Sequence, residues 1–300
     1  MEYLVLDIGG SAIKYGLVND QNEFIEKGDV PAPKENIEQF IDSIVGLYKK
    51  YEGKIVGIGI SMPGAIDPSI GFAYTGGAYS YIKNMKIVEM LQEHIPLPIT
   101  IGNDAKCAAN AEIGFGCLQD VEDAAVVILG TGIGGCIVNG GKVHIGKHFA
   151  SGEFSWMRTN GEDGNNFDDN WCMKNGIVGL LNSVQEAMNT TEEYNGKQIF
   201  EMANNGNKEV LAGLDKFCKE LAIQLFNLQS LFDPEKIAIG GGISAQSLLL
   251  EITNKHIDDM YQQALKYNSP IARPEVVLCK YRNDANLLGA LYQLKEAMGK

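Results

Sequence analysis

Near the N-terminus, hydrophobic residues alternate with other residue types, which is typical of β-strands. Apolar and β-branched residues run from Tyr3 to Ile8 and from Ala12 to Val18, and Gly9-Gly10-Ser11 joins the two runs. Two short apolar runs around a glycine turn predict a β-hairpin. A further strand is expected around Glu23 to Val30.

The apolar positions then change to a helical spacing. Residues Ile37, Phe40, Ile41, Ile44 and Tyr48 fall on one helical face, which predicts a helix from about Glu35 to Tyr51. Strands and helices then alternate in the predicted order: a strand over Ile55 to Ile60 ending in the loop Ser61-Met62-Pro63-Gly64, a helix over Lys86 to His94, a strand over Ile99 to Gly102 and a helix over Asp104 to Ile113.

The second half repeats this order. A second hairpin is predicted for Ala124 to Leu129 and Ile133 to Asn139, around Gly130-Thr131-Gly132. The elements expected after it are a long helix over Lys208 to Phe232, a strand over Lys236 to Ile239, the loop Gly240-Gly241-Gly242-Ile243-Ser244, a further helix, a strand over Glu275 to Tyr281 and a final helix from about Asp284. Two related α/β lobes that face each other leave a cleft for ligands.

The fold expected from this duplication is α/β, with two lobes and a ligand cleft between them. One lobe comprises residues 1–115 with the C-terminal helix 284–300, and the larger lobe comprises residues 116–283. The segment Met157 to Asn175 is polar and is predicted to be a surface loop near the cleft, with the loop-forming residues Asn160, Gly161, Asp163, Gly164, Asn165 and Asn166.

Composition narrows the class of protein. The 300 residues suffice for two domains, and the net charge of −13 argues against nucleic acid, which needs basic surface. The six cysteines are scattered without a Cys-x-x-Cys pair, and no basic leader or membrane-spanning apolar run is present. We therefore expect a cytoplasmic protein with reduced thiols and no membrane partner.

Both glycine turns carry groups suited to phosphate. In Asp7 to Lys14 an acid at a strand end precedes a turn whose N–H groups can donate to phosphate oxygens, and Asp7 could hold Mg²⁺ through water. The alternative is an ordinary hairpin turn. Gly130 to Gly135 repeats the device, and because the residues after it are strand-like, a dinucleotide-binding fingerprint is rejected.

Two further loops lie at element ends. Gly240 to Ser244 follows a strand and precedes a helix, which suits close approach by a flat or phosphorylated ligand, or is simply a βα loop. At Asn103-Asp104 a strand becomes a helix, and Asp104 is expected to cap that helix, to act as a catalytic base for a sugar hydroxyl, or both.

In this order, these pieces resemble the ROK family of bacterial sugar kinases and transcriptional repressors, within the actin-like ATPase superfamily. The resemblance covers nearly the whole chain, and the segments that carry it are Asp7 to Lys14, Pro63-Gly64, Asn103-Asp104-Ala105 with Glu112, Leu129 to Gly135, Gly152-Glu153, Asp233-Pro234-Glu235, Gly240 to Ser244 and Asn283 to Ala290. Ser11 stands where the family usually has Thr.

The resemblance implies an ATP- and Mg²⁺-dependent carbohydrate kinase that forms a homodimer. Asp104 would be the general base, while Gly64, Asn103, Asp104, Glu153 and Trp156 would bind the sugar. The nucleotide and its phosphates would lie against Asp7, Gly9, Gly10, Ser11, Lys14, Gly130, Thr131, Gly132, Gly241 and Gly242, with Asp7 near the metal. Such a role is consistent with phosphoryl transfer, which depends on positioning and charge neutralisation.

The chain departs from the zinc-bearing members of that family. They have a His three residues after the Glu and a Cys cluster beyond it, whereas here Trp156 takes the His position and only Cys172 follows. We expect no structural zinc, since about four N or S ligands are required. The string Gly-Glu-Phe-Ser-Trp-Met is similar to that of zinc-lacking members, among them β-glucoside kinases. Trp156 is then either a stacking surface for a sugar or aglycone, or a core residue.

The substrate stays open at this stage. The favoured reaction is phosphorylation of the 6-hydroxyl of glucose or of a β-glucoside such as cellobiose, and N-acetylmannosamine and fructose are the alternatives. The second sugar-binding Glu of the family has no clear counterpart, although Asp168 or Asp169 could serve. A sugar-responsive regulatory protein is the non-enzyme alternative. The acidic chain, which opens directly with the first predicted strand, argues against a DNA-reading repressor.

Overall fold

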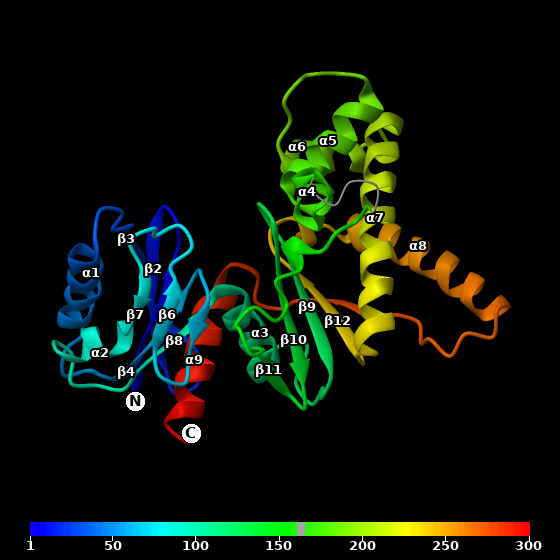
Figure 1. Cartoon of the computed structure of the whole chain (residues 1–300). Coiled ribbons are helices and arrows are strands. Elements are labelled where there is room, and N and C mark those ends of the chain that lie inside the picture. The colour runs from blue at the N-terminus through cyan, green and yellow to red at the C-terminus, as the bar shows by residue number, and fades with distance from the viewer. Residues whose placement is uncertain (161–165) are drawn as a thin grey trace. The chain divides into compact units, whose positions relative to one another are not determined.

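The chain forms two compact units, each built on its own sheet. The computed structural model describes residues 1–160 and 166–300. The first unit comprises Met1–Gln119, Ile145–Ser151 and Asn283–Lys300, and the second comprises Asp120–His144 and Gly152–Arg282. Figure 1 shows sheets and helices in both units, so the predicted α/β class is confirmed.

The first unit is organised by a five-stranded sheet in the order β3-β2-β1-β4-β8. Its strands are β1 (Glu2–Ile8), β2 (Ala12–Asn19), β3 (Phe24–Pro31), β4 (Ile55–Met62) and β8 (Ile99–Asn103). Strand β2 is antiparallel to β1 and β3, whereas β4 is parallel to β1 and β8. The unit also contains β5 (Ile66–Asp67), β6 (Phe72–Thr75), β7 (Lys83–Met85), α1 (Ile37–Lys50), α2 (Ile87–Gln92), α3 (Asp104–Phe115) and α9 (Ala285–Ala297).

Helix α1 illustrates how the sequence pattern builds this core. Asn36 caps it by accepting a hydrogen bond from the Gln39 N–H, and the predicted apolar face is buried, including Phe40 and Ile44. Figure 1 shows α1 and α2 on one side of the sheet, and α9 packs against β1, β4 and β8. The parallel strands are thereby covered by helices, as buried parallel strands require.

The second unit has a sheet of the same topology, β11-β10-β9-β12-β13. Its strands are β9 (Ala124–Leu129), β10 (Ile133–Asn139), β11 (Lys142–His144), β12 (Lys236–Gly240) and β13 (Val276–Leu278). Again the first three strands of the chain order pair antiparallel and the last two add in parallel. The duplication expected from the two glycine hairpins is therefore confirmed at the level of strand order.

The helices of the second unit pack into one apolar core with this sheet. They are α4 (Trp171–Asn175), α5 (Ile177–Met188), α6 (Gly196–Asn204), α7 (Lys208–Phe232) and α8 (Ser247–Lys266), with short 3₁₀ segments at Phe154–Trp156 (η1), Phe167–Asp169 (η2) and Ile243–Ala245 (η3). A fourth 3₁₀ segment, Arg282–Asp284 (η4), lies where the chain passes from the second unit to the first. The predicted bounds of β9, β10 and α7 agree with the structure. Among the described residues, no helix combines the length and apolar character needed to cross a membrane.

Two sequence-based expectations need correction. The segment Met157 to Asn175 is not a simple surface loop, because it contains η2 and α4, and Trp171, Asn170 and Asn175 are fully buried. The Trp171 indole N–H donates to Asn175 Oδ1 at 2.7 Å, which keeps this polar group satisfied inside the core. The predicted loop residues Gly161, Asp163, Gly164 and Asn165 lie outside the described residues.

Residues 145–151 also differ from their expected place. They were assigned to the second lobe, but they belong to the first unit. A reason lies in their packing, since the ring of Phe149 stacks on that of Tyr74 with centroids 5.0 Å apart. An aromatic contact of this kind joins segments far apart in sequence and leaves no local signal.

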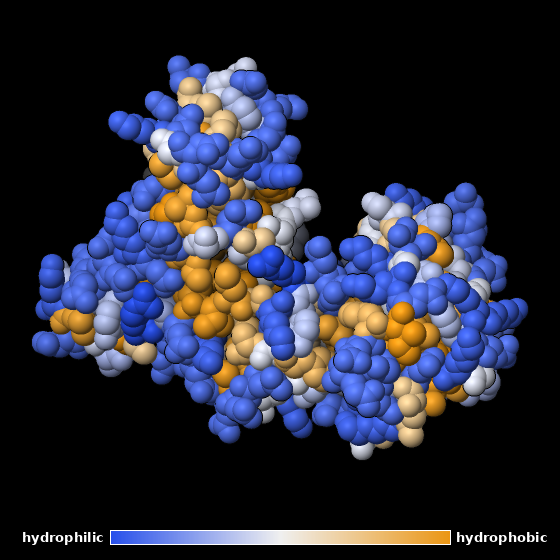
Figure 2. Space-filling view, turned by 180° about the vertical axis from the view of Figure 1, so that it is seen from behind, coloured by the Kyte–Doolittle hydropathy of each residue, from blue (hydrophilic) through white to orange (hydrophobic). Residues whose placement is uncertain are grey.

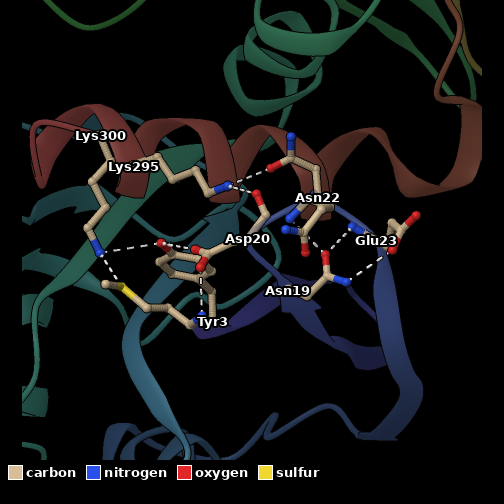
Figure 3. Close-up of polar contacts among 9 residues, drawn as sticks. Tyr3, Asn19, Asp20, Asn22, Glu23, Lys295 and Lys300 are labelled. Carbon is tan, nitrogen blue, oxygen red and sulfur yellow. Dashed lines mark hydrogen bonds and ion pairs between the residues drawn. The ribbon is translucent and has the colours of Figure 1, made fainter.

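The chain termini are fastened together inside the first unit. The N-terminal amino group of Met1 forms an ion pair with Asp20 at 2.6 Å, and the Tyr3 hydroxyl donates to the same carboxylate. Lys295 of α9 donates to the Asp20 carbonyl and to Asn22 Oδ1, as Figure 3 shows. The amino group of Met1 lowers the pKa of Asp20 through its hydrogen bond. The network fixes α9 beside the β1–β2 hairpin.

On the face drawn in Figure 2 most residues are hydrophilic, and apolar residues gather in a continuous area on the second unit. In the second unit, Leu231 and Phe232 at the end of α7 are the exposed apolar residues of that helix terminus.

Candidate functional site

The turn between β1 and β2 is held by hydrogen bonds at Gly9 and has free space beside Gly10. The Gly9 N–H donates to the Ala12 carbonyl at 3.0 Å, and the buried Tyr79 hydroxyl donates to the Gly9 carbonyl at 2.6 Å. A Cβ added at Gly10 would meet only Ala78 Cβ, at 3.8 Å, so space remains beside this backbone. Burial, and then the nearby Asp7 carboxylate, raise the pKa of Tyr79, so its hydroxyl stays a donor.

Asp7 is held by side chains from two other elements. Its Oδ1 accepts hydrogen bonds from Ser61 Oγ at 3.2 Å and from Asn286 Nδ2 at 2.9 Å. Lys14 lies directly opposite Asp7 in the antiparallel register, so the two side chains share a face of the sheet. Both hydrogen-bond donors to Asp7 are neutral, so they orient the carboxylate without neutralising it. The carboxylate of Asp7 offers oxygen ligands, which are the ligands that Mg²⁺ takes, so this residue fits a magnesium site.

Asn103, not Asp104, is the N-cap of α3. The Asn103 side-chain oxygen accepts from the Lys106 N–H at 3.3 Å, and its Nδ2 donates to the Gly64 carbonyl at 3.0 Å. The cap prediction for Asp104 is therefore wrong, because β8 continues one residue further than expected and the helix begins at Asp104 itself. Asp104 Oδ1 accepts from the Ala105 N–H at 2.8 Å, within the first turn.

Gly64 can only be a glycine at this place. Its φ is +113°, and an added Cβ would lie 2.1 Å from the Thr75 carbonyl oxygen. The loop after β4 is thus pressed against β6 and offers its carbonyl to Asn103. This hydrogen bond joins two of the predicted sugar-binding residues, Gly64 and Asn103, and the third, Asp104, follows Asn103 directly in the chain.

These features lie along one edge of the first sheet. Asp7 pairs with Ser61 across β1 and β4, and Ser61 pairs with Gly102 across β4 and β8. With strands about 4.8 Å apart, the backbones of Asp7 and Gly102 are roughly 10 Å apart at the carboxyl ends of parallel strands. Ligands of α/β sheets bind outside that edge.

The equivalent edge of the second sheet carries the second glycine turn. The Gly130 N–H donates to the Gly132 carbonyl at 3.0 Å, and the Ile177 N–H at the start of α5 donates to the Gly130 carbonyl at 2.9 Å. An added Cβ at Gly130 would meet nothing within 4 Å. The N-terminus of α5 therefore holds this turn through the Gly130 carbonyl, and the space beside the Gly130 Cα is free of protein atoms. Helix N-termini favour anions, and so does an exposed run of backbone N–H groups.

A cavity of about 340 Å³ opens beside this turn, wholly within the second unit. Its lining is mostly apolar, and Lys197 is the charged residue that contributes: Leu129, Gly130, Thr131, Ile177, Leu180, Gly196, Lys197, Phe200, Gly242, Ile243 and Gln246. Apolar walls with a few polar groups at one end suit a flat heteroaromatic ligand carrying a polar extension.

Gly241 and Gly242 have different roles. Gly242 lines the cavity, and an added Cβ there would meet nothing within 4 Å. Gly241 has a φ of +88°, and its added Cβ would lie 2.2 Å from the Leu129 carbonyl oxygen. Gly241 therefore allows the loop to pack on β9, whereas Gly242 faces the space a ligand could take.

Glu153 and Trp156 lie at the two ends of η1. Glu153 immediately precedes this 3₁₀ turn and is exposed, and Trp156 at its end is 62% exposed. Trp156 makes an edge-to-face contact with Phe167, which is itself 52% exposed, with ring centroids 5.9 Å apart. The alternative that Trp156 is a core residue is wrong, because most of its side chain is exposed. The buried tryptophan of this unit is Trp171. In η2, Asp168 is exposed and Asp169 is buried.

Comparison with known proteins identifies the family. A model of the ROK family matches residues 3–297. The chain belongs to the ROK family. A beta-glucoside kinase of Listeria monocytogenes is 30% identical over 298 residues, covering 97% of both chains. An N-acetyl-D-glucosamine kinase of Vibrio atlanticus is 30% identical over 308 residues, covering 97% of this chain and 98% of the other.

A solved structure supports the same family assignment. A ROK family protein from Streptococcus pneumoniae, in complex with sucrose, matches with a TM-score of 0.88 and 29% identity, covering 100% of this chain and 99% of the other. The family expected from the motifs is thus confirmed. The two named relatives, matched along almost their whole length, are sugar kinases, which agrees with the enzyme class that the motifs predicted.

Several residues around the two turns were missed from the sequence. Helix α5, which closes the second turn, has apolar residues at helical spacing (Ile177, Leu180, Leu181 and Val184), so its periodicity could have revealed it. The capping box of Asn195 and Gln198 likewise marks the start of α6. No local pattern marks Tyr79 or Ser61, because their roles depend on contacts with distant segments.

Proposed function

We propose that this ROK family member transfers the γ-phosphoryl group of ATP to a hydroxyl of a hexose-type sugar, with a β-glucoside such as cellobiose as the preferred class. The observation that carries the proposal is the arrangement at the end of β8. There Asp104 opens α3 next to Asn103, which is fastened to the Gly64 carbonyl at 3.0 Å. A carboxylate held on a rigid strand-to-helix junction is suited to take a proton from a bound hydroxyl.

The nucleotide is assigned to the second unit. The 340 Å³ cavity would hold the adenosine against apolar walls such as Leu180 and Phe200, and the adjoining turn at Gly130 and Thr131 would receive phosphates on its N–H groups. The N-terminus of α5 behind the turn adds a favourable field for anions. The β1–β2 turn, with Gly10 and Ser11, is the corresponding phosphate contact in the first unit.

In the reaction, the sugar hydroxyl oxygen attacks the γ-phosphorus, the bond to the bridging oxygen of ADP breaks, and Asp104 receives the hydroxyl proton. Asn103 and Glu153 would orient the sugar through hydrogen bonds to its hydroxyl groups. Asp7, oriented by Ser61 and Asn286, would hold the hydration shell of the magnesium ion. When bound with ATP, that ion neutralises charge on the phosphate oxygens.

The preference for a β-glucoside rests on the aromatic pair Trp156 and Phe167. Two exposed rings in edge-to-face contact give a ligand an apolar face and a ring edge, which a second sugar ring or an aglycone can cover. Glu153, three residues before Trp156, would bind the first ring. One relative is named a beta-glucoside kinase, and a sucrose complex is known for a similar structure.

The proposal is tested by measuring ADP release from ATP by the purified protein with glucose, cellobiose, N-acetylglucosamine, N-acetylmannosamine and fructose. We expect the highest kcat/KM with cellobiose. Absence of turnover with every sugar, together with measurable sugar binding, would favour the regulatory alternative. Highest turnover with an N-acetylated sugar would leave the kinase assignment intact and refute the β-glucoside preference.

The aromatic pair is tested by Trp156→Ala. Stacking on an aromatic ring contributes about 0.5–1.5 kcal/mol, so we expect kcat/KM for cellobiose to fall by about 2- to 13-fold. Glucose, which has no second ring, should change by less than about twofold, because the loss applies only to the second ring. Tyr267→Ala is the matched control, since that ring is 80% exposed on a different segment. Equal losses for both sugars would contradict the assignment.

A further inference from the structure

A single hydroxyl group links η1 to the second glycine turn. Ser155 Oγ accepts a hydrogen bond from the Ile133 N–H at 3.1 Å and donates one to the Ile133 carbonyl at 2.7 Å. Ile133 is the first residue of β10 and follows Gly132 directly. An added Cβ at Gly132 would lie 3.3 Å from Ser155 Oγ, so the hydroxyl also lies close to the turn itself.

This double hydrogen bond restricts more than one contact would. Because the hydroxyl engages both polar groups of one residue, it fixes the position and the tilt of the backbone at Ile133 relative to η1. The neighbouring Phe154 is buried at 4% exposure and anchors η1 in the core of the same unit. Ser155 is therefore a polar link between the start of β10 and η1.

The two linked segments carry different parts of the proposed site. Residues Gly130 to Gly132 are assigned to the phosphates, whereas Glu153 and Trp156, on either side of Ser155, are assigned to the sugar. Ser155 is thus placed between the two ligands' binding segments. The Ser155 hydroxyl is therefore a direct contact through which a change at η1 would reach the turn.

We propose that Ser155 is a positioning residue that couples sugar binding to nucleotide binding, an inference that rests on the proposed kinase function. Each ligand orders one end of the linked segment, so the second ligand meets a backbone that is already in place. Such coupling is reciprocal: the factor by which the sugar tightens the nucleotide equals the factor by which the nucleotide tightens the sugar.

The test compares dissociation constants in the wild type and in Ser155→Ala. The constant for ADP is measured by calorimetry with and without a saturating amount of the sugar that gives the highest turnover, and the constant for that sugar is measured with and without ADP. For the wild type we expect a coupling factor of at least about 5, the lower end of typical values. For Ser155→Ala we expect a factor close to 1, with ADP affinity in the absence of sugar changed by less than about threefold.

Thr253→Val is the matched control for lost stability. The buried Thr253 hydroxyl donates to the Leu249 carbonyl at 2.7 Å in α8, so the substitution removes a buried hydrogen bond without involving η1 or the glycine turn. It should lower the melting temperature and leave the coupling factor unchanged. A purely structural role for Ser155 predicts the same behaviour in both variants.

The outcomes separate the two proposals. A wild-type factor near 1, or a Ser155→Ala factor within about twofold of the wild type, overturns the coupling role while sugar phosphorylation stands. Absence of turnover with every sugar overturns the kinase function itself, and the coupling role with it.

Discussion

Replacing Asp104 with Asn tests whether this carboxylate is the catalytic base. The substitution preserves size, and the amide oxygen can still accept the Ala105 N–H that Asp104 Oδ1 accepts at 2.8 Å. The N-cap is untouched, because Asn103 supplies it. The interaction of one negative charge with the start of α3, typically about 0.3–1 kcal/mol, is then lost.

The expected loss in activity is much larger. The sugar hydroxyl is almost fully protonated at neutral pH, and a positioned base contributes on the order of 10²–10⁴ in rate. We therefore expect kcat to fall by at least about 100-fold, which corresponds to about 2.7 kcal/mol of transition-state stabilisation. The contrast between a small change in unfolding free energy and a large change in kcat distinguishes a base from a structural residue.

The assay measures kcat by ADP release, sugar affinity by calorimetry and the unfolding free energy by urea titration. Asp67→Asn is the matched control, because Asp67 Oδ1 also accepts a backbone N–H, from Ser69 at 3.0 Å, in the same unit. It should retain normal turnover. Turnover of Asp104→Asn within about threefold of the wild type would refute the reasoning, since removal of a base that contributes a rate factor on the order of 10² must lower kcat by much more than that.

Three further predictions concern the second glycine turn, Asp7 and zinc. Gly130→Ala should weaken ATP binding by at least about 10-fold, because the new methyl group would occupy the proposed phosphate space. The melting temperature should stay unchanged, because that methyl group meets no protein atom within 4 Å. Gly46 is equally open, so Gly46→Ala is the control and should leave ATP binding unaffected. Asp7→Asn should lower kcat by at least about 10-fold and raise the Mg²⁺ concentration needed for half-maximal activity, while sugar affinity stays within about twofold of the wild type. Loss of sugar affinity at a normal kcat would contradict the metal role of Asp7. Elemental analysis of protein purified without chelator should find no stoichiometric zinc, and about one zinc per chain would refute the expectation drawn from the missing His and Cys ligands.

Local patterns predicted most of the regular structure. The apolar runs around Gly9 and Gly130 predicted both hairpins, and the helical spacing from Ile37 to Tyr48 matches the face of α1 that is buried. These signals are local because strand and helix periods repeat within a few residues. The weakest prediction was Met157 to Asn175, where abundant polar residues suggested a loop although Asn170 and Asn175 are buried.

The sequence by itself determined the family, the α/β class and the order of the two glycine hairpins, because each depends on residues close together in the chain. Only the tertiary structure decided which side chains hold the site in place: Asn286 reaches Asp7 across 279 positions, and Tyr79 reaches Gly9 across 70. It also decided that Asn103 caps α3 and that Ser155 holds the start of β10. Such contacts depend on how strands and helices pack, and one polar residue in a loop leaves no periodic trace of the partner it will meet.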